Sequence, residues 1–188
     1  MKRRLLELAL VTAGVVCLSK AGWTLYRYQY FQNQPLPKRF LLPASTSHAN
    51  GERGTYNPPI LGQLSIPRLR VSAVMVEGDD DESLSLAAGH MKGTAPIGSK
   101  GNIVIAGHRD TVFWPLRNIK AGDSIVVSTD KQYVYTVEKT QIVDPSNTDA
   151  LQDSQREILT LITCYPFRHI GSSPKRFIVT AKLSHAQS

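Results

Sequence analysis

Between residues 60 and 185 the chain consists of short segments rich in Val, Ile, Thr and Tyr, and this pattern constrains its fold most strongly. Such residues favour β-strands, and the Gly, Pro, Asn and Asp between them favour turns. Residues 80–88 are expected to form a short helix, capped by Asp79, Asp80 or Asp81 and ended by Gly89. Strands are predicted at 61–66, 71–76, 102–106, 124–128, 133–143, 158–163 and 176–183.

About seven or eight strands with one or two short helices predict an all-β domain in the form of a closed or nearly closed barrel. The pattern alone leaves a two-sheet sandwich open. A chain of 188 residues provides one such domain, and a hydrophobic content of 41% excludes a wholly disordered protein. Its two cysteines exclude a disulfide scaffold and a four-cysteine zinc site.

The formal net charge of +7 is concentrated at the N-terminus. Residues 1–40 hold seven of the 22 Lys and Arg residues and one of the 15 Asp and Glu residues. The rest of the chain is therefore nearly neutral and has no charge excess with which to bind a nucleic-acid backbone.

Residues 1–31 are predicted to form a cytoplasmic tip and a transmembrane signal anchor. Lys2-Arg3-Arg4 precedes an apolar stretch over residues 5–18 that only Glu7 interrupts, and aromatic side chains follow from Trp23 to Phe31. About 20 helical residues cross a bilayer, and basic residues before the apolar stretch place the N-terminus in the cytoplasm. These features predict a single-pass plasma-membrane protein with an extracytoplasmic domain. A cleaved signal peptide and an amphipathic helix on a soluble core are the alternatives.

Residues 32–59 have no hydrophobic periodicity and carry five prolines, together with the Ser/Thr-rich run at 44–47. This composition predicts an extended linker or stalk. The chain accordingly divides into the anchor at 1–31, the stalk at 32–59 and the β-rich domain at 60–188.

Three residues with useful chemistry lie at the ends of predicted strands: His108, Cys164 and Arg176. A thiolate is a nucleophile, and an imidazole acts as a general acid or base near neutral pH. A guanidinium is a permanent cation that can stabilise an oxyanion. Each residue also has a structural interpretation, as a buried cysteine, a packing histidine or a surface charge, so none identifies a function alone.

Metal binding is another use for His90, His108, Cys164 and His169. No pair of them has the short spacing of a structural zinc site, so we expect no metal there. The acidic run at 79–82 could attract a cation, but a solvated helix N-terminus is the simpler interpretation.

Three blocks taken together resemble the sortase family: Gly107-His108-Arg109-Asp110-Thr111, Thr160-Leu161-Ile162-Thr163-Cys164 and Lys175-Arg176-Phe177-Ile178-Val179. The surrounding stretches, 89–108 and 164–176, look most like class D sortases. The resemblance covers about residues 60–184. It implies a sortase-type closed β-barrel of about eight strands.

The resemblance also implies a membrane-anchored cysteine transpeptidase of the cell envelope that cuts a substrate near its C-terminus, between Thr and Gly of an L-P-x-T-G-like motif. By position, Cys164 would be the nucleophile, His108 the general acid and base, and Arg176 the ligand of the oxyanion or substrate carbonyl. Thr163 would help to shape the substrate-binding site. Asp110 and His90 are candidates for supporting these side chains.

The implied partners are proteins with a C-terminal sorting motif, an amine acceptor on a cell-wall precursor or a protein, and the lipid bilayer, with no nucleic acid. Water can replace the amine, so a slow hydrolase, or thiol protease, side reaction is expected. The scheme requires no metal and no organic cofactor. Calcium, which some relatives bind, is possible but is not predicted.

Other functions fit the motifs less well. An L,D-transpeptidase would require S-x-G-C, whereas Ile162-Thr163-Cys164 stands here, and a papain-like protease places its Cys before its His. From another class, a non-catalytic membrane-anchored β-barrel adaptor is the alternative. A selectively reactive Cys164 thiol would favour the enzyme, and an inert thiol the adaptor.

Overall fold

The computed structural model describes residues 2–32, 58–169 and 171–187. It divides the chain into two compact units, residues 1–34 and residues 35–188. Nearly all of the predicted stalk at 32–59 lies outside the described residues.

The first unit consists of the helix α1 (Lys2–Gln32). A helix was predicted here, and its presence is confirmed. In the described residues, however, no helix has both the length and the apolar character needed to cross a membrane. Lys20 and Arg27 interrupt the described apolar stretch that begins at Leu10. The expectation of a transmembrane helix is corrected accordingly, and membrane attachment stays a prediction from the sequence.

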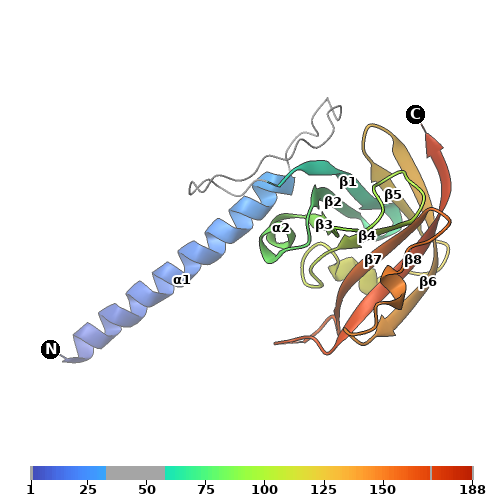
Figure 1. Ribbon diagram of the computed structural model, residues 1–188. Helices are drawn as coiled ribbons and strands as arrows, with labels where there is room; N and C mark the ends of the chain where they lie inside the picture. The colour runs from blue at the N-terminus through green and yellow to red at the C-terminus, as the bar shows by residue number, and fades with distance from the viewer. Residues whose placement is uncertain (1, 33–57, 170, 188) are drawn as a thin grey trace. The chain divides into compact units, whose positions relative to one another are not determined.

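The second unit is a closed barrel of eight strands, as predicted, in the order β1-β2-β3-β4-β7-β8-β6-β5 (Figure 1). Closure excludes the two-sheet sandwich. Neighbouring strands are antiparallel except for the parallel pairs β2 with β3 and β4 with β7. The strands are β1 (Ile60–Ile66), β2 (Val71–Glu77), β3 (Ala88–His90), β4 (Asn102–Ala106), β5 (Ser124–Ser128), β6 (Gln132–Val143), β7 (Ile158–Tyr165) and β8 (Lys175–Gln187).

The short helix α2 (Asp81–Leu86) begins where it was predicted, because the Asp80 carboxylate accepts a hydrogen bond from the Ser83 N–H at 3.0 Å. It ends earlier than predicted, and β3 follows at once. The sequence Ala-Gly-His of β3 has no strand-favouring residue, so the pattern did not reveal it. Gly89 is required there because a Cβ would lie 2.1 Å from the Gly78 carbonyl oxygen.

The described residues also form three short 3-10 helices: η1 (Pro67–Leu69), η2 (Trp114–Asn118) and η3 (Asp149–Leu151). Arg68 of η1 donates hydrogen bonds to both carboxylate oxygens of Asp123 and to the Asn118 carbonyl oxygen. The hydrogen-bonded guanidinium holds the pKa of Asp123 below its ordinary value. This ion pair therefore fixes η1 against the end of η2.

Apolar side chains less than 2% exposed fill the core, and each adds roughly 1.5–3 kcal/mol by burial. The largest side chain buried to this extent is Tyr135, whose hydroxyl donates a hydrogen bond to Glu157 at 2.6 Å. Burial, and then this hydrogen bond, raise the pKa of Tyr135 above its ordinary value. The close packing makes the strands a rigid support for the residues at their ends. The core includes Leu64, Ile66, Met75, Ile103, Ile105, Ile125, Leu159, Leu161 and Ile178.

Candidate active site

His108 and Cys164 lie at the ends of adjacent parallel strands. Ala106 of β4 is paired with Ile162 of β7, and the Gly107 N–H continues the pairing with a 3.2 Å hydrogen bond to the Ile162 carbonyl oxygen. His108 follows Gly107 directly, and Cys164 lies two residues beyond Ile162 on β7, so the ends of adjacent strands carry two residues that are 56 positions apart in sequence. The order of strands therefore produces a proximity that the sequence alone could not show.

Arg176 joins this pair from the other side of β7. Antiparallel pairing makes Cys164 and Arg176 direct partners on β7 and β8. Neighbouring strands lie about 4.8 Å apart, and paired residues project from the same face. All three predicted residues are partly exposed, so a substrate can reach them. Figure 1 shows β4, β7 and β8 side by side in the barrel wall.

The backbone around His108 is held on both sides. The Thr163 hydroxyl donates a 2.6 Å hydrogen bond to the Gly107 carbonyl oxygen, and the Phe113 N–H donates one of 3.0 Å to the His108 carbonyl oxygen. The buried Phe113 ring packs directly on Gly107, where a Cβ would lie 2.6 Å from the ring. Glycine at position 107 is thus a packing requirement next to the catalytic candidate.

Arg109 connects this segment to the loop that joins β7 to β8. Its guanidinium donates hydrogen bonds to the Ser173 hydroxyl, to the His169 carbonyl oxygen at 2.9 Å and to the Gly171 carbonyl oxygen at 3.3 Å. Arg109, the residue directly after His108, therefore fixes the position of the loop between Cys164 and Arg176.

The guanidinium of Arg176 is itself oriented by this loop. Its Nη1 donates to the Ser173 carbonyl oxygen at 3.2 Å and to the Lys175 carbonyl oxygen at 3.1 Å. A guanidinium carries five N–H donors, and both of these described bonds use one nitrogen. Among the described residues, no hydrogen bond uses the donors on its other two nitrogens.

The remaining predicted residues are placed differently. Thr163 is 3% exposed, so its observed contact with the site is the one to Gly107, and its part in binding substrate stays a prediction. His90 is buried on β3, where its ring nitrogens face the Glu77 carboxylate and the Ala95 carbonyl oxygen, each at 3.0 Å. Asp110 is exposed, and in the described part of the chain no hydrogen bond joins it to His108.

No metal site emerges from these side chains. Among the described residues, no group of three or more His, Cys, Asp or Glu is arranged to hold an ion. In the acidic run at 79–82, Asp80 accepts hydrogen bonds from the N–H and the hydroxyl of Ser83 and so caps α2. His169 is exposed, and its Nε2 faces the Ser172 carbonyl oxygen at 3.0 Å.

Comparison with known proteins decides the family. The family model described as "Sortase domain" matches residues 64–184, which is the greater part of the chain. The chain belongs to the sortase family. Sortases are cysteine transpeptidases, and the resemblance in the three sequence blocks is confirmed.

Individual sortases resemble the chain over most of its length. Sortase D of Bacillus subtilis is 30% identical over 194 residues, covering 96% of this chain and 98% of its own. Among solved structures, the Clostridium perfringens sortase D5 transpeptidase has a TM-score of 0.61 at 30% identity, covering 67% of this chain and 79% of that one. Listeria monocytogenes sortase A has a TM-score of 0.62 at 27% identity, covering 68% and 89%. The similarity to class D is thus also confirmed.

Sequence reasoning missed two residues that build this sortase site. The sequence analysis used Arg109 and Gly107 only as parts of a motif. The contact of Arg109 with the β7–β8 loop and that of Gly107 with Phe113 form only in the folded protein. Their position directly before and after His108 was the feature of the sequence that could have indicated their importance.

Proposed function

We propose that this sortase cleaves a C-terminal L-P-x-T-G-like motif between Thr and Gly and transfers the acyl group to an amine. The observation that supports the proposal is the register of β4, β7 and β8, which pairs Arg176 with Cys164 and ends β4 at Ala106, two residues before His108, beside Ile162 of β7. These groups provide a nucleophile, a proton carrier and a fixed cation, which acyl transfer requires.

In the first half-reaction, the Cys164 thiolate attacks the carbonyl carbon of the substrate threonine. The C–O double bond opens, and Arg176 donates hydrogen bonds to the oxyanion. When the carbonyl reforms, the C–N bond to glycine breaks, and His108 gives a proton to the departing amine. A thioester at Cys164 and a free glycine amine are the products.

In the second half-reaction, His108 takes a proton from the incoming amine, which attacks the thioester carbonyl. Collapse of the second tetrahedral intermediate breaks the C–S bond, forms the new amide and returns the Cys164 thiolate. Water can take the place of the amine, which gives slow hydrolysis. The loop held by Arg109 contributes to this scheme by keeping Arg176 in position.

The partners proposed for this reaction are proteins with a C-terminal sorting motif and an amine acceptor on the cell wall or on another protein. Location at the plasma membrane, with the N-terminus in the cytoplasm and the barrel outside, rests on the sequence of residues 1–31 alone. Neither half-reaction requires a metal or an organic cofactor.

The test is cleavage of a fluorogenic L-P-x-T-G peptide in the presence of triglycine, with separate measurement of the ligated and hydrolysed products. Cys164→Ala is expected to abolish both products, and His108→Gln and Arg176→Gln to lower kcat/KM by about 10²–10⁴-fold each. Arg176→Lys should recover part of the rate, because it restores the charge but not the fork of donors. Full activity in Cys164→Ala would overturn the proposal.

A further inference from the structure

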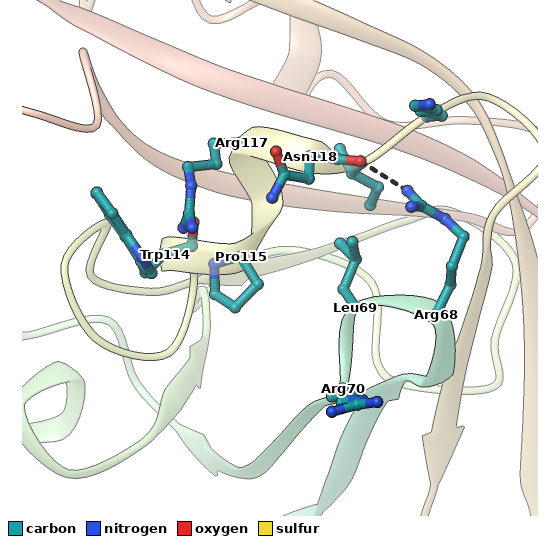
Figure 2. Close-up of a pocket in the computed structure, with 9 residues that line it drawn as sticks. Arg68, Leu69, Arg70, Trp114, Pro115, Arg117 and Asn118 are labelled. Carbon is teal, nitrogen blue, oxygen red and sulfur yellow. Dashed lines mark hydrogen bonds between the residues drawn. The ribbon is translucent and has the colours of Figure 1, made fainter.

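A second candidate site lies between the 3-10 helices η1 and η2. The pocket there has a volume of about 660 Å³, within the usual range for small-ligand sites. Its nine lining residues do not include His108, Cys164 or Arg176. Figure 2 shows Leu69 of η1 and Pro115 of η2 between the two turns, with arginine side chains around them.

The lining of this pocket carries positive charge only. Arg68, Arg70, Arg117 and Lys120 contribute four cations, and no Asp or Glu lies among the lining residues. The Asp123 carboxylate pairs with Arg68 and is also affected by the charge of Lys120, so these four cations share one carboxylate, and among the described residues Arg70 and Arg117 form no ion pair with a carboxylate. Since the charges of residues 41–188 nearly balance, this is a local concentration rather than a general property of the domain.

The backbone of Arg70 gives a second, independent observation. Arg70 has φ 53° and ψ 35°, and no other non-glycine residue in the described part of the chain has a positive φ. This left-handed conformation costs an ordinary residue roughly 1–2 kcal/mol, and glycine or asparagine adopts it more easily. An exposed arginine at this turn is therefore not explained by the fold, because a smaller residue would stabilise the turn better.

Trp114 supplies the aromatic wall of the pocket. The Arg117 guanidinium lies 4.0 Å from the centre of the Trp114 ring and also donates a 2.7 Å hydrogen bond to the Trp114 carbonyl oxygen. The ring makes an edge contact with Phe167, at 6.5 Å between centroids, three residues after Cys164. Arg117 is thus held against Trp114, which also lines the pocket, and Trp114 connects the pocket to the segment that follows Cys164.

We propose that this pocket binds the phosphate or diphosphate group of a phosphorylated ligand through Arg70, Arg117 and Lys120. A single carboxylate would balance one of these three cations, whereas a phosphate or diphosphate carries more charge and matches the forked donors of arginine. The volume leaves room for a body attached to the phosphate. The site is separate from the cysteine chemistry and does not depend on the proposed cleavage reaction.

Trp114 provides the readout for a direct test. The chain has two tryptophans, Trp23 and Trp114, so Trp23→Phe leaves Trp114 as the sole tryptophan, which is excited selectively over the tyrosines at the red edge of the absorption band. The full chain with this substitution is titrated in nonionic detergent, at constant ionic strength, with inorganic phosphate, inorganic pyrophosphate or glycerophosphoglycerol, the deacylated headgroup of an anionic phospholipid. We expect a saturable change in Trp114 emission. Tightest binding of pyrophosphate would indicate a diphosphate ligand, and tightest binding of the diester a lipid headgroup.

Charge-removing variants separate the pocket from general attraction of anions. Arg70→Asn keeps a residue that tolerates the turn, and it should raise Kd about tenfold without lowering the melting temperature. Lys120→Gln should weaken binding similarly. The control Arg156→Gln removes an exposed cation outside the pocket and should leave Kd unchanged. Absence of a saturable change, or equal weakening in Arg156→Gln, would overturn the proposal.

Discussion

At the scale of single residues, the position of His108 depends on neighbours that take no part in the chemistry. Its own carbonyl oxygen is bonded to the Phe113 N–H, and the carbonyl oxygen before it is bonded to the Thr163 hydroxyl. Thr163 is 56 residues from Gly107 in sequence, and nothing in the residue pattern indicates that the Phe113 N–H bonds to His108. The chemical roles of Cys164, His108 and Arg176 are predictions from residue type and motif, whereas residue type and motif did not indicate these supporting contacts.

Thr163 gives the first prediction. Thr163→Val keeps the shape of the side chain but leaves the buried Gly107 carbonyl oxygen without its donor. We expect a loss of about 1–3 kcal/mol in the free energy of unfolding and a lower kcat, because His108 is less firmly held. Urea denaturation and peptide cleavage measure the two effects. Thr163→Ser retains the hydroxyl and should stay close to wild type; equal losses in both variants would contradict the role assigned to the hydrogen bond.

Arg109 gives a second prediction at this scale. Arg109→Gln removes the hydrogen bonds to the β7–β8 loop and should reduce kcat/KM for the peptide by about 10–100-fold. The rate of Cys164 alkylation by iodoacetamide should hardly change, because that reaction does not need Arg176. Arg168→Gln, which removes a charge from the same loop, serves as the matched control. Parallel loss of alkylation and cleavage would show that Arg109 supports the fold in general.

At the scale of elements, the parallel pairing of β4 with β7 matters most, because it aligns the ends of two strands. Both strands were predictable from their Val, Ile, Leu and Thr content, and their boundaries were nearly right. Their adjacency was not, since parallel partners are joined through distant connections. The strand β3 was missed for another reason: its short, weakly strand-favouring sequence is stabilised by its neighbours β2 and β4.

The contact between Gly107 and Phe113 tests how tightly the end of β4 is packed. Gly107→Ala should destabilise the barrel by about 1–3 kcal/mol, because the new methyl group would overlap the Phe113 ring. Phe113→Leu in the same chain should relieve part of this loss. Denaturation of the two single variants and the double variant measures the coupling. Strict additivity of the two losses would contradict direct steric conflict.

The pairing of η1 with Asp123 predicts a pH dependence of stability. The pKa of Asp123 is lowered in the folded state by Arg68, so its stabilising effect is present above the ordinary aspartate pKa of about 3.9 and is lost as the pH falls through the lower folded value. Arg68 is 46% exposed on its side chain, so we expect only about 1 kcal/mol. Denaturation between pH 2 and pH 6 should show that the free energy of unfolding falls less with decreasing pH in Asp123→Asn than in the wild type. An unchanged pH profile in this variant would contradict the prediction.

At the scale of the whole molecule, the catalytic candidates belong entirely to the barrel unit. The pattern of short strands predicted a closed or nearly closed barrel but left a two-sheet sandwich open, and the resemblance to sortases implied the closed barrel. The N-terminal helix was predictable as a helix, but the structure gives no membrane-spanning helix among the described residues. The order and register of β4, β7 and β8 determine where the candidate catalytic residues lie relative to one another.

A deletion tests this division of roles. Removing residues 1–31 should leave kcat/KM for a soluble peptide within about twofold, because the site lies in the unit of residues 35–188. If residues 1–31 attach the chain to a membrane, the full chain will sediment with membranes and the shortened chain will not. Sedimentation of both chains would contradict attachment through these residues. A large loss of peptide cleavage would contradict the independence of the barrel.

The central claim is that Cys164 accepts an acyl group from a threonine of the substrate. Intact-protein mass spectrometry after brief incubation with an L-P-x-T-G peptide, quenched in acid, measures this directly. We predict an added mass equal to that of the peptide acid ending at threonine minus one water, located on Cys164 by fragmentation and released by hydroxylamine. Absence of the adduct from wild type, while the peptide is still cleaved, or its presence in Cys164→Ala, would contradict the account.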